Sequence, residues 1–297
     1  MHGVWTALIT PFNESSQLDL SAFKRILQEQ VRAGVSGVIP CGTTGEAPTL
    51  SREEKKILIQ TSLQELKGTS VQVVAGVGTS NTQETLELAT WAAQAGVAGL
   101  LVVTPYYNKP SQAGLESHFL SIAEAVSCEV ILYNVPGRTG VSLTAETVVR
   151  LAKHPRIRTL KEGQIPLASE IFDLAARNGL SIDLLSGDDS NYLPLLSIGG
   201  AGVISVASNL FPRAMVAIQN AVDQGHLAEA RAIHQRFYPL FRDLFIESNP
   251  VPVKQAMADL GWCLPKVRMP LAPLALASVE KLRQSLRYCG VTQGALL

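Results

Sequence analysis

The feature that most constrains the fold is a recurring unit, a short apolar run followed by a helical pattern, repeated about eight times at roughly 25 to 30 residues each. The apolar runs, which we expect to be strands, span residues 4–9, 36–40, 71–75, 99–103, 130–133, 157–160, 182–185 and 202–206. The helical patterns that follow them span residues 20–31, 51–66, 81–95, 112–125, 144–152, 167–176, 191–196 and 212–222. This alternation predicts an α/β protein with a (β/α)8 TIM barrel.

The alternative architecture is an open doubly wound sheet, which would carry a glycine-rich phosphate-binding turn after its first strand. The residues at that point, Thr10-Pro11-Phe12-Asn13, do not form such a turn, and the units continue without a break in composition. Beyond residue 225 the strand pattern stops, and helical patterns follow at 227–245, 252–260 and 273–288. We therefore expect a barrel with the active site over residues 1–225 and a C-terminal helical segment over residues 226–297.

Charge and cysteine content exclude several classes of protein. Lysine plus arginine balance aspartate plus glutamate at 25 each, so no nucleic-acid or membrane partner is indicated. The four cysteines are far apart, without a CxxC pair, which predicts reduced thiols and argues against a metal site. The first residues lack the pattern of a signal peptide, and no apolar run approaches the roughly 20 residues of a membrane span. We expect a cytoplasmic globular protein.

In a TIM barrel the active groups lie at the carboxyl ends of the strands and in the loops that follow. Tyr133 ends one expected strand, Lys161 follows the next, and Arg138 lies in the turn between them. If these two strands are parallel neighbours, the three side chains converge on one pocket. Other expected strand ends carry Thr43, Thr44, Glu46, Tyr106, Tyr107, Glu162, Gly187, Asp188, Asp189 and Ser205.

A lysine in that position suggests amine chemistry. Burial in an apolar barrel mouth disfavours the ammonium form, and the free amine forms a Schiff base with a keto acid. A neighbouring tyrosine can relay protons, threonine hydroxyls can extend the relay, and an arginine binds a carboxylate bidentately.

Plainer roles remain open for each of these residues. A lysine after a strand is usually solvated, and the turn 42–45 can be a simple turn or an anion-binding nest. Glu46 and Glu162 can satisfy backbone groups or pair with cations, and Asp188 can cap the helix that follows.

Several short sequence motifs occur in the order known from one family. They are 42–46 (GTTGE), 104–110 (TPYYNKP), 133–140 (YNVPGRTG), 161–162 (KE), 185–189 (LSGDD) and 249–254 (NPVPVK). In these motifs the chain resembles the 4-hydroxy-tetrahydrodipicolinate synthase (dihydrodipicolinate synthase) family of class I Schiff-base pyruvate aldolases. The resemblance extends from about Val4 to the C-terminal helices.

The resemblance implies a lyase that condenses pyruvate with aspartate semialdehyde in lysine and diaminopimelate biosynthesis. Lys161 would form the Schiff base, and Tyr133, Thr43 and Tyr107 would relay protons, Tyr107 across a dimer interface. The implied substrate-binding residues are Thr44, Gly187 and Ile204 for pyruvate and Arg138 for the carboxylate of the aldehyde. No metal or organic cofactor is implied, and family members are most often homotetramers built as dimers of dimers.

Two departures from the family pattern stand out. Gly163-Gln164 follows Lys161-Glu162 where the family commonly has Ala-Thr-Gly, which bears on substrate geometry. The stretch that resembles the family's inhibitory lysine site carries cations, so we expect weak or absent inhibition by lysine. The residues of that possible allosteric site are Arg52, Lys55, Ser80, Glu84 and Tyr106.

Two other functions compete with the synthase. A sibling pyruvate aldolase, such as an N-acetylneuraminate lyase or a keto-deoxy sugar acid aldolase, would share the lysine and the tyrosine. Arg138 favours a small carboxylate-bearing aldehyde over a sugar. A catalytically silent barrel is the other alternative, and the joint presence of Lys161, Tyr133, Thr43 and Tyr107 argues against it.

Overall fold

The computed structural model describes residues 1–291 of the 297-residue chain. Eight parallel strands form a closed barrel in the order of the sequence, which confirms the predicted fold class. The strands are β1 (Gly3–Ala7), β2 (Gly37–Ile39), β3 (Gln72–Gly76), β4 (Gly99–Val103), β5 (Glu129–Tyr133), β6 (Thr159–Glu162), β7 (Asp183–Ser186) and β8 (Gly202–Ser205).

The chain divides into two compact units, which are described separately. The first comprises Met1–His2 and Val73–Ile204, and the second comprises Gly3–Gln72 and Ser205–Leu297. This division is not the predicted one. The boundary predicted at residue 225, between the barrel and the C-terminal helical segment, stays a prediction.

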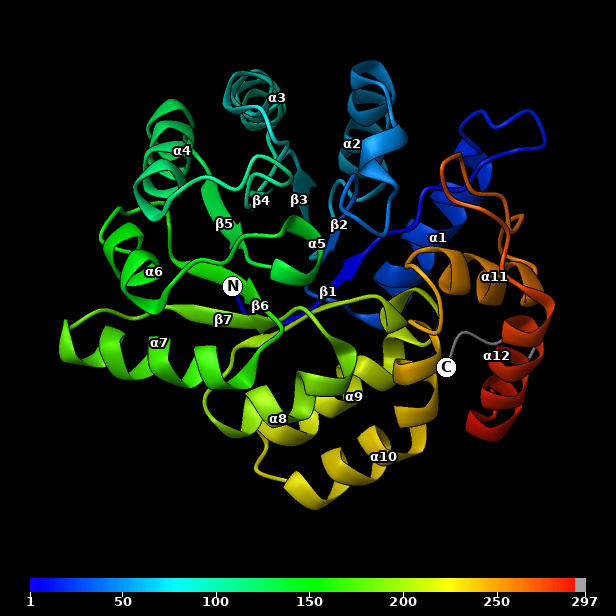
Figure 1. Ribbon diagram of the computed structural model, residues 1–297. Coiled ribbons are helices and arrows are strands. Elements are labelled where there is room, and N and C mark those ends of the chain that lie inside the picture. Colours follow the sequence, from blue (N-terminus) through cyan, green and yellow to red (C-terminus); the bar gives the residue numbers. More distant parts are fainter. Residues whose placement is uncertain (292–297) are drawn as a thin grey trace. The chain divides into compact units, whose positions relative to one another are not determined.

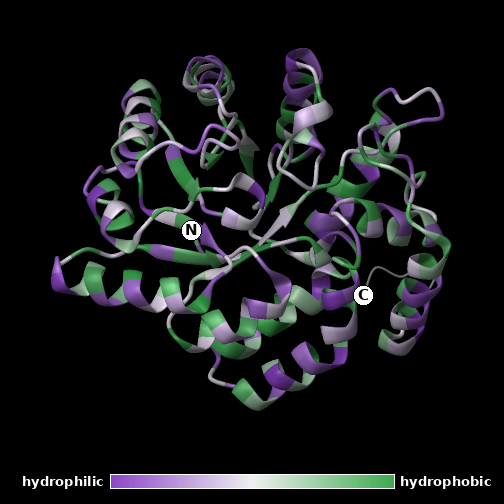
Figure 2. Ribbon diagram, in the orientation of Figure 1, coloured by the Kyte–Doolittle hydropathy of each residue, from purple (hydrophilic) through white to green (hydrophobic). Residues whose placement is uncertain are grey.

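In the first unit, helices alternate with strands β3 to β8. The helices are α3 (Thr82–Ala95), α4 (Gln112–Ala125), α5 (Pro136–Thr139), α6 (Ala145–Leu151), α7 (Ile165–Arg177) and α8 (Tyr192–Ser197), with a short 3-10 turn, η2 (Asp189–Asn191). Neighbouring helices pack together in the order α3, α4, α6 and α7 (Figure 1). Along α7 the ribbon alternates between hydrophobic and hydrophilic colours, as expected for a helix with one buried face (Figure 2).

The strand register in the first unit decides which side chains share a face of the sheet. Tyr133 in β5 pairs with Lys161 in β6, and Lys161 pairs with Leu185 in β7. Residues that are directly paired on neighbouring strands point to the same side, and the next residue along each strand points to the other side. The register therefore puts Tyr133 and Lys161 on one face.

In the second unit, β1 and β2 are accompanied by α1 (Leu20–Ala33), α2 (Arg52–Glu65), α9 (Pro212–Asp223), α10 (Leu227–Asp243), α11 (Val251–Asp259) and α12 (Leu276–Cys289). Two 3-10 turns, η1 (Ala47–Thr49) and η3 (Ala207–Asn209), complete it. Helix α10 packs against both α9 and α12, and the rings of Phe211 and Phe237 stack with centroids 4.7 Å apart. The helices predicted at the end of the chain are therefore part of this unit's core.

Local signals in the sequence locate most helix starts. The Asp19 carboxylate accepts a hydrogen bond from the Ala22 N–H at the start of α1. At the start of α2, Ser51 and Glu54 form a capping box, in which each side chain accepts from the other residue's backbone N–H. These starts are fixed by side chains only three residues away, so the local sequence contains the information that sets them.

Two details of the prediction were wrong. The strand expected at 157–160 is β6, Thr159–Glu162, so Lys161 lies within a strand and not after it, because its neighbours pair with it on both sides. The segment after Tyr133, expected to be a tight turn, contains the short helix α5. Among residues 1–291, no helix is both long and apolar enough to cross a membrane.

Candidate active site

Lys161 is the buried amine of the first unit. The residue is only 5% exposed, and its Nζ lies 4.2 Å from the centroid of the Tyr133 ring. Among the described residues, Nζ makes no ion pair and no hydrogen bond. The predicted approach of Tyr133 and Lys161 is thus confirmed, and the amine faces an aromatic ring instead of a carboxylate.

Gly187 leaves the space that Lys161 occupies. A Cβ atom at this position would lie 3.3 Å from the Cε and 3.4 Å from the Cγ of Lys161, which is tighter than an ordinary contact. The Gly187 N–H also donates to the backbone oxygen of Glu162. Ile204, buried in β8, shares the face of Leu185 and Lys161, since Leu185 pairs with Gly202 two residues before it. A side chain at position 187 would therefore crowd Lys161, while the predicted role of Gly187 in the pyruvate pocket stays a prediction.

Arg138 lies on α5, in the loop between β5 and α6, and its side chain is exposed. The side chain of Asn134 closes this loop: its Oδ1 accepts from the Leu143 N–H at 3.0 Å and its Nδ2 donates to the Ser142 hydroxyl at 3.1 Å. The structure thus anchors the two ends of the loop that carries Arg138, while the convergence of Arg138 with Lys161 stays a prediction.

Tyr107 stands out by its exposure and its backbone. The residue is 91% exposed and has a φ of 74°, which is uncommon for an aromatic residue. Its N–H donates to the Thr139 oxygen at 3.3 Å, and Asn108 Nδ2 donates to the Ser80 oxygen at 3.0 Å. The loop that carries Tyr106 and Tyr107 is therefore held between the Ser80 loop and the Arg138 loop.

Glu162 lies directly after Lys161 and is 2% exposed. Its Oε2 accepts from Asn134 Nδ2 at 2.7 Å, and its Oε1 accepts from the N–H groups of Gly163 and Gln164 at 2.8 Å each. Burial raises the pKa of Glu162 above the usual value, and these hydrogen bonds oppose the rise. Of the alternatives left open by the sequence, the one in which Glu162 satisfies backbone groups is confirmed.

In the second unit, Thr43 and Thr44 lie in the turn that follows β2. The turn is closed by hydrogen bonds from the Gly45 N–H to the Gly42 oxygen and from the Glu46 N–H to the Thr43 oxygen, at 3.1 Å each. The Thr44 hydroxyl accepts from Asn249 Nδ2 at 3.0 Å, so its own proton can be donated elsewhere.

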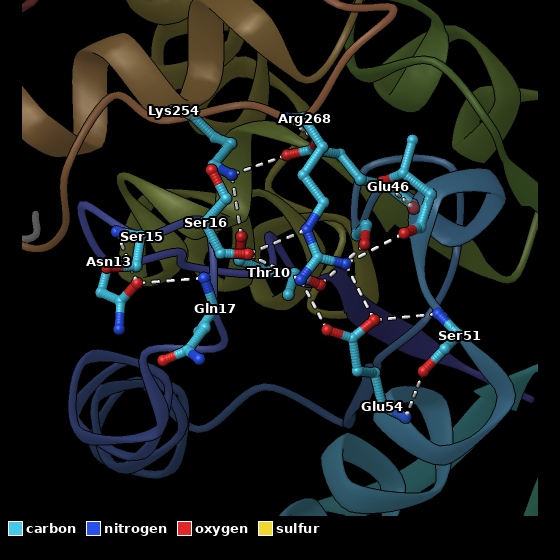
Figure 3. A network of polar contacts seen from close by, with 12 residues as sticks. Thr10, Asn13, Ser15, Ser16, Gln17, Glu46, Ser51, Glu54, Lys254 and Arg268 are labelled. Atoms are coloured by element: carbon cyan, nitrogen blue, oxygen red, sulfur yellow. Dashed lines mark hydrogen bonds and ion pairs between the residues drawn. The ribbon is translucent and has the colours of Figure 1, made fainter.

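A charged network fixes the same turn from its end (Figure 3). Lys254, which is 0% exposed, donates from Nζ to Glu46 Oε1 at 2.6 Å and to the Thr10 oxygen at 2.8 Å. The Arg268 N–H donates to Glu46 Oε2 at 2.9 Å. Burial lowers the pKa of Lys254, and the Glu46 carboxylate opposes this effect. The pairing of Glu46 with a cation, one of the predicted alternatives, is confirmed.

The guanidinium of Arg268 extends this network to α2 and to the loop after β1. It donates to both carboxylate oxygens of Glu54 and to the Ser16 oxygen, and it lies 4.2 Å from the centroid of the Phe12 ring. Figure 3 shows the Arg268 and Glu54 side chains pointing toward each other. Sequence reasoning missed Asn134, Asn249, Lys254 and Arg268 as supports of the site, and the partners of the last three lie more than 200 residues away in the sequence.

The residues of the predicted lysine site fall in both units. Arg52 and Lys55 lie on α2 in the second unit, and Ser80, Glu84 and Tyr106 lie in the first. Within the first unit, Ser80 and the loop of Tyr106 are linked through Asn108. Asp188 caps η2 by accepting from the Ser190 N–H, as the plainer alternative held.

No cluster of three or more histidine, cysteine or acidic side chains that could hold a metal occurs in residues 1–291. Within that range the cysteines are free thiols, and burial raises the pKa of Cys41 and Cys263 to about 12. Neither thiol is therefore a candidate nucleophile at neutral pH.

Comparison with known proteins identifies the family of this chain. The model of the dihydrodipicolinate synthetase family matches residues 1–288. The chain belongs to this family. A 4-hydroxy-tetrahydrodipicolinate synthase of Leptospira biflexa serovar Patoc is 48% identical over 275 residues, which cover 92% of each chain.

Solved structures of similar proteins align with almost the whole chain. The 4-hydroxy-tetrahydrodipicolinate synthase of Methylacidiphilum fumariolicum SolV aligns with a TM-score of 0.94 at 42% identity, covering 98% of this chain and 96% of that one. The dihydrodipicolinate synthase of Cyanidioschyzon merolae, solved with lysine bound, aligns with a TM-score of 0.93 at 38% identity, covering 98% of each chain. Membership of the dihydrodipicolinate synthetase family thus holds for sequence and fold along almost the whole chain.

Proposed function

We propose that this chain has the activity for which its relatives are named, that of a 4-hydroxy-tetrahydrodipicolinate synthase. It condenses pyruvate with L-aspartate 4-semialdehyde through a Schiff base, at the first committed step of diaminopimelate and lysine biosynthesis. The observation that carries this proposal is the Lys161 amine, buried on a barrel strand against the Tyr133 ring and without an ion-pair partner among the described residues.

The reaction begins when the Lys161 amine adds to the C2 carbonyl of pyruvate and water leaves, which gives an imine. Loss of a proton from C3 gives an enamine, whose C3 attacks the aldehyde carbon of the second substrate. The amine of that substrate then attacks the imine carbon and displaces Lys161, which closes the ring. Tyr133, Thr43 and Tyr107 relay the protons of these steps.

The substrate carboxylates need separate binding groups. We propose that the Thr44 hydroxyl donates to the pyruvate carboxylate, because its lone pair is engaged by Asn249 and its proton is available. Gly187 and Ile204 line the pyruvate pocket, and Arg138 binds the carboxylate of the aldehyde substrate. No metal or organic cofactor takes part.

The exposed, positive-φ Tyr107 supports a homo-oligomer in which this side chain is covered by a second copy of the chain. We propose a homotetramer, a dimer of dimers, that works in the cytoplasm.

The direct test offers purified protein pyruvate together with either aspartate semialdehyde or N-acetylmannosamine. The proposal predicts turnover with aspartate semialdehyde alone, and loss of that turnover in Arg138→Ala. Turnover only with the sugar aldehyde would contradict it and would identify a sibling aldolase, in which the Gly163-Gln164 loop decides the substrate. A protein that gains no adduct with pyruvate and borohydride would be a silent barrel.

Regulation by lysine is a separate proposal. Two cations, Arg52 and Lys55, occupy the possible inhibitor site that also includes Ser80, Glu84 and Tyr106, and like charges disfavour binding of a cationic amino acid. We expect turnover with aspartate semialdehyde to be unchanged by lysine below about 1 mM, whereas a relative with a functional lysine site, assayed alongside, is inhibited. Half-inhibition at sub-millimolar lysine would contradict this expectation.

A further inference from the structure

We propose that Asn134 and Glu162 are positioning residues that hold the Arg138 loop and thereby set the affinity for the aldehyde substrate. The inference rests on the proposed function, in which Arg138 binds the carboxylate of that substrate. It adds two residues that touch neither substrate and act through the loop of residues 134–143.

The pair lies immediately behind the two central residues of the site. Tyr133 and Lys161 are paired in register, so Asn134 and Glu162, the next residue along each strand, point to the opposite side of the sheet. There the two side chains meet, with Asn134 Nδ2 2.7 Å from Glu162 Oε2. Both residues are 2% exposed, so bulk water screens neither the hydrogen bond between them nor the charge of the Glu162 carboxylate.

Glu162 determines which way the Asn134 amide points. Its Oε1 is occupied by the N–H groups of Gly163 and Gln164, which leaves Oε2 to face Asn134. A carboxylate only accepts, so Asn134 must present its NH2 group to Glu162 and its oxygen elsewhere. The oxygen then faces the Leu143 N–H at 3.0 Å.

With that orientation, Asn134 closes the loop. The same NH2 group reaches the Ser142 hydroxyl at 3.1 Å, so one side chain at the start of the loop binds two residues at its end. Arg138 lies between these anchors on α5, a helix of only four residues that has no side-chain cap. The position of the guanidinium therefore depends on Asn134, and through Asn134 on Glu162.

The pair is not needed to join the strands. The Asn134 N–H already donates to the Lys161 oxygen at 3.1 Å, which continues the β5–β6 ladder without either side chain. A buried carboxylate costs free energy, and burial raises the pKa of Glu162 accordingly. A role in fixing the loop explains why a carboxylate and an amide stand here instead of two apolar side chains.

The test exchanges the two functional groups. Glu162→Gln keeps an oxygen for Gly163 and Gln164 but turns an NH2 group toward the NH2 group of Asn134. Asn134→Asp instead sets two carboxylates against each other. In the double variant the introduced amide donates to the introduced carboxylate, so the contact is restored with reversed polarity.

Each single variant is expected to raise KM for aspartate semialdehyde about tenfold, while KM for pyruvate and borohydride trapping of pyruvate on Lys161 stay within about threefold of wild type. The double variant is expected to return to within about threefold of wild type for both substrates. Asn178→Asp makes the same chemical change at an exposed Asn whose Nδ2 donates to the Leu174 oxygen, and it should leave both KM values unchanged.

The outcomes separate the inference from the proposed function. Wild-type protein that forms the pyruvate adduct but does not turn over aspartate semialdehyde contradicts the proposed function, and with it the substrate assigned to the pair. With an active wild type, equal effects on both KM values, or effects in the double variant as large as in the single ones, overturn the inference. If a single variant does not fold, the double variant must still fold and show wild-type KM values, and its failure also overturns the inference.

Discussion

Among residues 1–291, two lysines are buried, Lys161 and Lys254, and only Lys254 has an ion-pair partner. Lys254 is 0% exposed and its Nζ lies 2.6 Å from a carboxylate oxygen of Glu46. Lys161 is 5% exposed, lies against the Tyr133 ring, and has no ion-pair partner among the described residues. A buried ion pair engages both of its charged groups and serves structure, whereas a buried amine without an ion-pair partner has its Nζ available to a substrate.

The comparison also explains how each lysine is supported. Lys254 belongs to a network of ion pairs and hydrogen bonds that includes Glu46, Arg268 and Glu54 (Figure 3). Lys161 is positioned by backbone pairing and by the space at Gly187, and the one carboxylate near it in sequence, Glu162, is engaged by Asn134 and two backbone N–H groups.

Replacing the unpaired lysine should abolish catalysis and leave the fold intact. Lys161→Ala is expected to lower kcat/KM by at least about 1,000-fold, because no other group supplies the Schiff-base amine. Its free energy of unfolding should fall by less than that of Lys254→Met described next, because the truncation leaves a cavity but no unpaired buried charge. Steady-state kinetics and urea unfolding check both parts; a loss of stability comparable to the loss of activity would contradict the contrast.

Replacing Lys254, the paired lysine, should lower the stability of the fold. Lys254→Met leaves the buried Glu46 carboxylate unpaired, which is expected to lower the free energy of unfolding by about 3–5 kcal/mol. Adding Glu46→Gln removes the unpaired charge and should recover part of that loss. Urea unfolding measures the cycle. A single variant as stable as the wild type would show that the ion pair contributes nothing to the turn.

A third buried base, His118 on α4, tests whether burial without a counter-charge keeps a group neutral. Its Nδ1 hydrogen-bonds the Thr82 hydroxyl, and burial lowers the pKa of His118 from 6.5 to about 4. Between pH 6.5 and 4 the unfolded chain therefore binds a proton that the folded protein does not bind. The contribution of His118 to the free energy of unfolding is fully present above this window and is lost as the pH falls through it.

The expected loss from this histidine is about 3 kcal/mol across that window. Unfolding curves between pH 7 and pH 4 measure it, and His118→Gln should flatten the slope. His226→Gln removes an imidazole at an exposed position and serves as the control for the substitution itself. An identical pH dependence in wild type and His118→Gln would show that His118 titrates normally.

Crowding Lys161 should have the smallest effect. In Gly187→Ala the added Cβ lies 3.3 Å from Lys161 Cε, so the lysine must shift by a few tenths of an ångström, and adduct formation with pyruvate should slow by about three- to tenfold. Gly163→Ala is the matched control, because a Cβ there meets only the Cβ of Asp188 at 3.8 Å. Equal rates in the two variants would show that Gly187 does not set the room around Lys161.

Short-range patterns predicted most of the fold. The period of the apolar residues predicted eight strands and their helices, with β4 and α4 at the expected bounds. The capping residues of α1 and α2 lie within three residues of their partners, so they belong to the same short-range information. The adjacency of β5 and β6, which brings Tyr133 to Lys161, followed from the order of strands in a barrel.

The supports of the site could not be read in this way. Glu46 and Lys254 are 208 residues apart, and Asn249 and Thr44 are 205 apart, so no local pattern links them. Asn134 and Glu162 look like ordinary strand-end polar residues until the register of β5 and β6 sets them side by side. The start of β6 was misplaced by two residues because Ile157 is apolar and buried although it precedes the strand.

The most direct test of the central contrast is to trap the protein with pyruvate and borohydride and to locate the modified lysine by peptide mass mapping. We predict one reduced pyruvate adduct, on Lys161, in the wild type and in a folded Lys254→Met variant, and none in Lys161→Ala. An adduct on Lys254, or an adduct that survives in Lys161→Ala, would contradict the claim that the missing counter-charge marks Lys161 as the nucleophile.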